Sequence, residues 1–133
     1  MKTTIVRMLA VFACVIALNA HARVSLKACI ERASMDSVYY PMRIDADTTI
    51  TGVSCREEGG RVILIYDNKL ESPKSKLPKN AIENHKVATR NMLCTNPQLK
   101  ALLQLVDMEY VFYDSANVFV GIITHRIEDC GGQ

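Results

Sequence analysis

The chain has 133 residues and a nearly balanced charge, with 16 Lys and Arg against 14 Asp and Glu. Lys2 and Arg7 are the only charged residues among the first 22, so the rest of the chain carries as many basic as acidic side chains. No stripe of Lys and Arg with interleaved aromatic residues occurs, which argues against nucleic acid as a partner.

Residues 1–22 have the three parts of a signal peptide. Lys2 and Arg7 supply the positive start, residues 8–18 are apolar and uncharged, and Ala20-His21-Ala22 forms a small-x-small cleavage site. The apolar run is shorter than the roughly 20 residues that a membrane-spanning helix needs, and no later stretch approaches that length. We therefore expect cleavage after Ala22, a periplasmic or secreted protein, and no transmembrane segment in the mature chain.

The first part of the mature chain predicts a helix followed by a hairpin. Residues 24–33 carry apolar side chains at the i, i+3, i+4, i+7 spacing of one helix face. Residues 38–47 are expected to be irregular. Residues 48–57 and 62–66 are rich in β-branched side chains, and the glycines between them suit a tight turn. Gly52 inside the first of these strands marks a possible bulge.

The second part predicts two helices followed by another hairpin. Asn80 is expected to cap a helix that ends near Cys94, and the Thr95-Asn96-Pro97 sequence restarts a second helix. Residues 108–114 and 118–127 form the second hairpin, with a residue able to adopt a left-handed conformation in its turn. The shared face of the first of these helices consists of Ala81, Ile82, His85, Ala88, Met92 and Leu93.

These elements occur in the order α-β-β-α-α-β-β. Two hairpins with helices between them predict an α+β fold, in which a four-stranded antiparallel sheet is covered on one face by helices. The length of 23–133 suits a single domain.

Four cysteines remain after removal of the signal peptide: Cys29, Cys55, Cys94 and Cys130. An even number in a small exported domain is typical of two disulfides. Zinc is disfavoured because no short C-x₂₋₄-C or H-x₃₋₅-H pair is present, and we expect no metal and no organic cofactor. In an alternative interpretation Cys14, loosely preceded by a lipobox-like Val11-Phe12-Ala13, is a lipid-attachment cysteine and the protein is a lipoprotein.

The histidines and acids form no recognisable catalytic set. His85 lies in the middle of the long helix, and His125 lies beside Arg126 in the last strand, where it could face solvent. Neither accompanies a serine elbow or a nucleophilic cysteine motif. Acids such as Glu109 and Asp114 lie in strands and turns, where they are usually solvated. We therefore expect no catalytic residue and no enzymatic activity.

Three aromatic residues in the third predicted strand are candidates for partner binding. Strand alternation places Tyr110 and Phe112 on one face of the sheet, and Tyr113 with Val111 on the other. Core packing accounts for one of these faces. If no second layer covers the other face, its aromatic side chains form a surface for a protein partner.

Three sequence blocks resemble a family of small exported bacterial proteins. The first block consists of Pro41, Ile44, Asp45, Thr48 and Ile50. The second is a Leu-Cys-x-x-Pro-x-Leu pattern, comprising Leu93, Cys94, Pro97, Leu99, Lys100, Leu102 and Leu103. The third comprises Tyr110, Phe112, Asp114, Asp129 and Cys130. The same layout is similar to small pilotins of type II secretion systems, which hold an outer-membrane secretin subunit during its delivery.

The resemblance also bears on the disulfide pairing. Four cysteines allow three connectivities, and the sequence alone leaves all three open. The pilotin-like layout joins a helix cysteine to a C-terminal one, which implies Cys94–Cys130 and therefore Cys29–Cys55.

The favoured function is an exported, non-enzymatic binding module, an accessory to a secretion or envelope system with a protein partner. One alternative is a secreted inhibitor or effector-like protein that acts on another enzyme, since a compact disulfide-bonded domain suits that role too. A small hydrolase is the third hypothesis and the one that the residues favour least.

Overall fold

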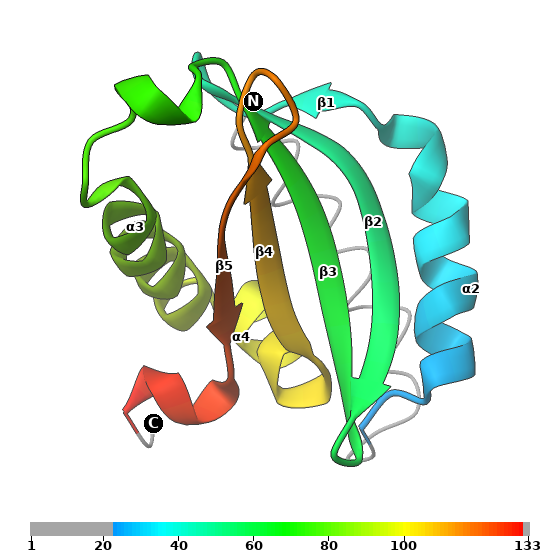
Figure 1. Cartoon of the computed structure of the whole chain (residues 1–133). Helices are drawn as coiled ribbons and strands as arrows, with labels where there is room; N and C mark the ends of the chain where they lie inside the picture. The colour runs from blue at the N-terminus through cyan, green and yellow to red at the C-terminus, as the bar shows by residue number, and fades with distance from the viewer. Residues whose placement is uncertain (1–22, 132–133) are drawn as a thin grey trace.

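The computed structural model describes residues 23–131, which form one sheet with helices beside it (Figure 1). Its main elements are α2 (Leu26–Asp36), β1 (Met42–Arg43), β2 (Thr48–Glu58), β3 (Arg61–Leu70), α3 (Ala81–Thr95), α4 (Pro97–Leu105), β4 (Asp107–Tyr113) and β5 (Phe119–His125). Short 3-10 helices are η1 (Ser37–Tyr39), η2 (Lys74–Lys76) and η3 (Ile127–Cys130). The signal peptide, its cleavage after Ala22 and the alternative at Cys14 lie outside the described residues.

The sheet is mixed and has five strands in the order β1-β2-β3-β4-β5. The prediction of four antiparallel strands is therefore wrong in two details. The two-residue strand β1, in the segment expected to be irregular, pairs with β2, and it is too short to leave a periodic pattern. β3 and β4 pair in parallel, because α3 and α4 return the chain to the end of the sheet where β3 begins.

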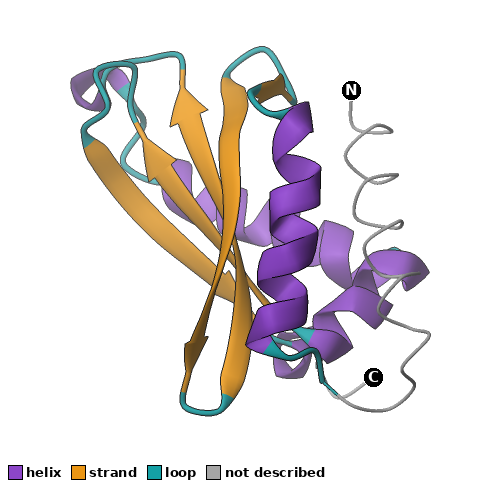
Figure 2. Ribbon diagram, turned by 90° about the vertical axis from the view of Figure 1, so that its right-hand side faces the viewer, coloured by secondary structure: helices purple, strands orange, loops and turns teal. Residues whose placement is uncertain are grey.

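All three α-helices of the described chain lie on the same side of the sheet (Figure 2). Alternation sends Leu64 and Tyr66 of β3 and Met108 and Phe112 of β4 to this side, and each of the four is at most 5% exposed. They join the buried leucines of α4 in the core. The other side of the sheet, which faces the viewer in Figure 1, carries no α-helix of the described chain. We call it the open face.

Local sequence signals account for most of the element boundaries. Gly59 and Gly60 have positive φ in the β2–β3 turn, and Asn117 has φ 63° in the β4–β5 turn. The register shifts between Ile50 and Gly52, as a bulge requires. The side chain of Asn96 accepts hydrogen bonds from two backbone N–H groups at the start of α4. Asn80 precedes α3 as expected but makes no such bond.

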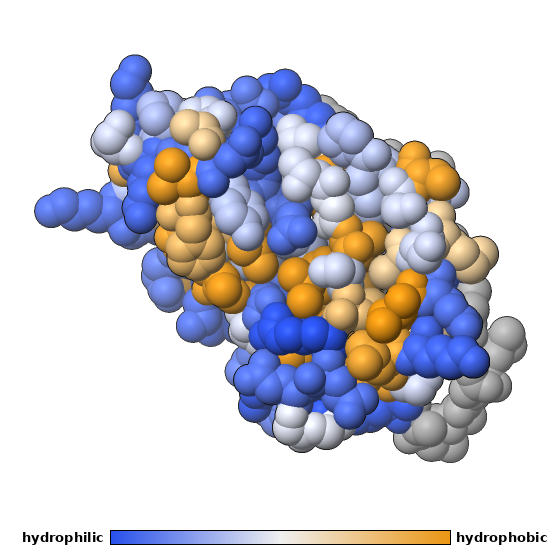
Figure 3. Space-filling model, turned by 45° about the vertical axis from the view of Figure 1, so that its right-hand side comes forward, coloured by the Kyte–Doolittle hydropathy of each residue, from blue (hydrophilic) through white to orange (hydrophobic). Residues whose placement is uncertain are grey.

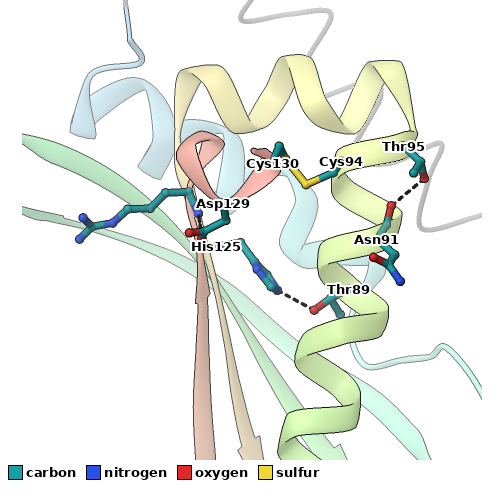
Figure 4. Close-up of a disulfide and its surroundings, with 8 residues drawn as sticks. Thr89, Asn91, Cys94, Thr95, His125, Asp129 and Cys130 are labelled. Atoms are coloured by element: carbon teal, nitrogen blue, oxygen red, sulfur yellow. Dashed lines mark hydrogen bonds between the residues drawn. A yellow bond between two sulfur atoms is a disulfide. The ribbon is translucent and has the colours of Figure 1, made fainter. Parts of the chain in front are cut away.

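Two disulfides fasten the outer helices, with the pairing that the resemblance implied. Cys29 and Cys55 join α2 to β2, and Cys94 and Cys130 join the end of α3 to η3, directly after β5 (Figure 4). α2 is thereby held over β2 and α3 is held near β5. The two central strands lie between these helices.

A candidate binding groove on the helical face

An open groove lies on the helical face where neither α2 nor α3 covers β3 and β4. Its volume is about 720 Å³. The floor consists of Tyr66, Asn68, Leu70, Tyr110 and Phe112. α3 forms one wall, and the segment from Ile44 to Ile50 forms the other. The volume and the predominantly apolar floor are typical of a binding site.

Aromatic rings form the centre of the floor. The rings of Tyr66 and Tyr110 stack with centroids 5.8 Å apart, and the ring of His85 on α3 lies 5.0 Å from that of Phe112. Burial raises the pKa of both tyrosines well above the ordinary value of 10. Both hydroxyls therefore remain neutral, which suits them to packing and hydrogen bonding and not to proton transfer.

The wall on α3 uses the helix face that the sequence analysis identified. Ala81, His85, Ala88 and Met92 line the groove, whereas Leu93 of the same face is buried in the core. The apolar face of α3 is thus divided between the core and the groove. Two of the groove-lining residues are alanines, whose small side chains leave room beside the helix.

A buried contact behind this wall supports its position. His125 of β5 is 1% exposed, and its Nε2 lies 2.6 Å from the Thr89 hydroxyl of α3 (Figure 4). Burial lowers the pKa of His125, and the charges of Arg90 and Lys86 lower it further against the opposing effect of Asp129. The expectation that His125 could face solvent is wrong, because it shares strand parity with the core residue Ile123.

The structure brings together two of the three aromatic candidates. Tyr110 and Phe112 lie side by side in the groove floor. Tyr113 lies on the open face, where its ring packs edge-on against that of Phe119 at 6.2 Å. Ile122 and Phe119 add exposed apolar surface there, at 51% and 48%. Figure 3, turned so that α2 comes forward, shows hydrophobic residues in patches bordered by hydrophilic ones.

Glu109 and Asp114, which were expected to be solvated, are buried and paired, and so is Asp107. Glu109 is 4% exposed and binds Arg56 through two hydrogen bonds of 2.6 and 2.9 Å. Asp107 is 1% exposed and receives two bonds of 2.8 Å from Arg61. Asp114 is also buried, and it accepts backbone N–H groups of its own turn and of η2. These carboxylates have structural partners.

Neighbouring arginines stabilise the ionised form of Asp107. Burial alone would raise its pKa, but the hydrogen bonds and charge of Arg61, with those of Arg23, outweigh burial and lower the pKa below its usual value of 3.8. Within residues 23–131 no three His, Cys, Asp or Glu side chains are grouped to hold a metal ion. No described helix has both the length and the apolar character needed to cross a bilayer.

Neither a family model nor a curated protein matches the sequence. Solved structures do share the fold. The pilotin EpsS of the Vibrio vulnificus type 2 secretion system has a TM-score of 0.63 at 10% identity, covering 81% of this chain and 93% of that chain. The type II pilotin AspS of Vibrio cholerae has a TM-score of 0.56 at 12% identity, covering 79% and 91%.

A further structure of the same fold comes from Pseudomonas aeruginosa, and that protein is provisionally described as secreted. Its TM-score is 0.62 at 20% identity, and the match covers 79% of this chain and 91% of that chain. At these identities the likeness concerns the fold. The chain therefore shares its fold with type II secretion pilotins, to which its cysteine layout is similar.

Proposed function

We propose that this protein is an exported, pilotin-like accessory protein that binds a segment of a protein partner in the groove between α3 and the sheet. The observation that carries the proposal is the groove itself, which is open, has an aromatic floor and lies in a fold shared with pilotins. The resemblance makes an outer-membrane secretin subunit the expected partner. Tyr110 and Phe112 are the proposed floor contacts.

The backbone of the floor strands favours a helical segment as the occupant. β3 and β4 are interior strands, and each is paired on both sides. They offer no free edge to which an extended peptide could add as another strand. A segment that enters an apolar groove must satisfy its own N–H and C=O groups, and a helix does so internally. An amphipathic helix would complete the helical layer between α2 and α3.

Site-specific photo-crosslinking in cells that express the full chain tests this proposal. Benzoylphenylalanine at Ala88, which lines the groove, should give an adduct with a secretin subunit. Benzoylphenylalanine at Ala101, an exposed position on α4 away from the groove, is the matched control and should give no adduct. An adduct with a foreign enzyme would support the inhibitor hypothesis in place of the adaptor. Equal adducts from both positions would contradict the groove as the site.

A substitution that fills the groove provides a second measurement. Ala88→Trp should lower the yield of co-purified partner at least about tenfold, because the indole occupies the space of the occupant. Ala101→Trp should leave that yield unchanged. Both variants should keep the melting temperature of the unsubstituted protein, because both alanines are exposed.

A further inference from the structure

One mouth of the groove is acidic. Asp45 and Asp47, in the turn between β1 and β2, line it together with Glu71 at the end of β3. Glu71 is paired with Arg43, at 3.7 Å. Among residues 23–131 neither Asp45 nor Asp47 is within ion-pair distance of a cation. Both carboxylates therefore remain without a direct ion-pair partner at the entrance to an apolar site, and the nearby Arg43 is bonded to backbone carbonyls of the turn and to Glu71.

The structure holds these two acids in place. The side chain of Asp45 accepts the backbone N–H of Asp47 at 2.8 Å, and the carbonyl of Asp47 accepts the backbone N–H of Glu71 at 2.9 Å. Arg43 donates two bonds to backbone carbonyls of the same turn. The backbone of the turn is thus tied to itself and to β3, which places both acids beside the groove.

Two hydroxyls of the groove lining lack a partner. Thr48 directly follows Asp47 in the same wall, is 1% exposed, and its hydroxyl has no hydrogen-bond partner within the described chain. The same is true of Tyr110 in the floor, which is 8% exposed. A buried polar group without a partner is costly, and an occupant that donates a hydrogen bond relieves that cost.

We infer that the helix bound in this groove carries a Lys or Arg at the end that lies against Asp45 and Asp47. This inference rests on the proposed function and adds the charge of the occupant to it. Apolar side chains of the helix contact the aromatic floor, and the cation lies over the two carboxylates near the Thr48 hydroxyl. Lys76 of η2 also lines the groove and repels that cation. The preference for a basic residue in the occupant therefore comes from the acidic turn and not from the groove as a whole.

Synthetic peptides test the charge preference on the purified full-length mature protein. The probes are amphipathic peptides of about 18 residues with blocked ends and one common Leu/Ala face. They differ in a terminal pair of Lys, Gln or Glu, placed at either end. Fluorescence anisotropy should show that one Lys peptide binds about fivefold more tightly than its Gln counterpart, as expected for two partly exposed ion pairs. High salt should reduce this preference.

Matched variants assign the preference to the acidic turn. Asp45→Asn with Asp47→Asn keeps the shape and the Asp45 acceptor, and should abolish the preference for Lys over Gln. Glu31→Gln with Glu57→Gln removes the same charge at exposed sites outside the groove lining, and should retain it. Lys76→Gln should increase the preference. If the pair of Asn substitutions disturbs folding, Asp47→Asn alone should reduce the preference for Lys over Gln by about half.

The outcomes separate this inference from the proposed function. If all peptides bind equally and Ala88→Trp blocks them, the groove binds helices but the inferred charge of the occupant is wrong. If Glu peptides bind best, the inference is also overturned. If no peptide binds, both the charge preference and the helix-binding groove are contradicted.

Discussion

On the helical face of β4, Met108 and Phe112 pack against apolar side chains of the helical layer, whereas on its open face Asp107 and Glu109 are covered by arginines. Strand alternation assigns the side chains to these two faces. On the open face each of the two buried carboxylates has a two-bond arginine partner. On the helical face the layer is incomplete, and a groove remains over Tyr110 and Phe112.

This difference shows which polar groups are available for function. A buried carboxylate with a bidentate arginine is already satisfied, and its role is to hold strands together. The hydroxyls of Thr48 and Tyr110, which lack a partner within the described chain, lie on the other face, where they line a space that the described chain leaves unfilled. The incomplete helical layer is therefore a better candidate site than the charged cluster of the open face, which consists of Asp107 and Glu109 with Arg56 and Arg61.

Breaking the disulfide behind the α3 wall should have the largest effect. Cys94→Ser with Cys130→Ser releases a loop of sequence separation 36, which in the chain-entropy model lowers the free energy of unfolding by roughly 3–4 kcal/mol. Denaturant unfolding of the purified protein measures it. Because this disulfide also positions a groove wall, partner capture should fall as well. Removal of Cys29–Cys55 should destabilise by a similar amount, and an unchanged midpoint for either variant would contradict the expectation.

Breaking the charged cluster should have the next largest effect and should spare binding. Asp107→Asn removes the charge that Arg61 and Arg23 share, and we expect a loss of about 2 kcal/mol, because the arginines can partly regain water. Glu128→Gln is the control, since its side chain is 61% exposed and its ion pair with Arg61 contributes little. A loss of partner capture by folded Asp107→Asn protein would show that the open face takes part in binding.

The two faces should also differ in their response to pH. The pKa of His125 is lowered in the folded protein from its usual 6.5, so the unfolded chain binds the proton first as pH falls. The free energy of unfolding should therefore decrease as pH falls from about 6.5 toward the lowered pKa. Asp107 also has a lowered pKa, and its contribution is lost only below pH 3.8. His125→Gln should remove the decrease in the free energy of unfolding just below pH 6.5 and should leave the decrease below pH 3.8. Urea titrations at each pH would measure both.

The local parts of this architecture follow from the sequence, and the long-range parts do not. Period-two alternation placed Tyr110 and Phe112 opposite Tyr113, because the direction of a side chain depends only on its own strand. The parallel pairing of β3 with β4 depends on where a long crossover ends. The burial of Glu109 depends on Arg56, 53 residues earlier. No local pattern contains either relation.

The candidate site could be predicted only in part from the sequence, for the same reason. Periodicity identified the apolar face of α3, but it cannot tell whether another element covers that face. Ala81 and Ala88 belong to that face, and in the structure they line an open groove, whereas Leu93 of the same face is buried in the core. Nothing in the local sequence places Asp45 and Asp47 at the mouth of that groove, because their position depends on the folded turn. A buried polar residue such as Thr48 could not be recognised before its neighbours were known.

The smallest expected effect concerns Tyr113, and it decides between the two faces as binding surfaces. Tyr113→Ala removes one edge-to-face contact with Phe119, and should lower the free energy of unfolding by only about 1 kcal/mol. If the groove binds the partner, this variant should capture as much partner as the unsubstituted protein, while Ala88→Trp captures almost none. The reverse result would assign binding to the exposed apolar surface of Tyr113, Phe119 and Ile122. The same pull-down on both variants therefore separates a site formed by an incomplete helical layer from one formed by an uncovered sheet.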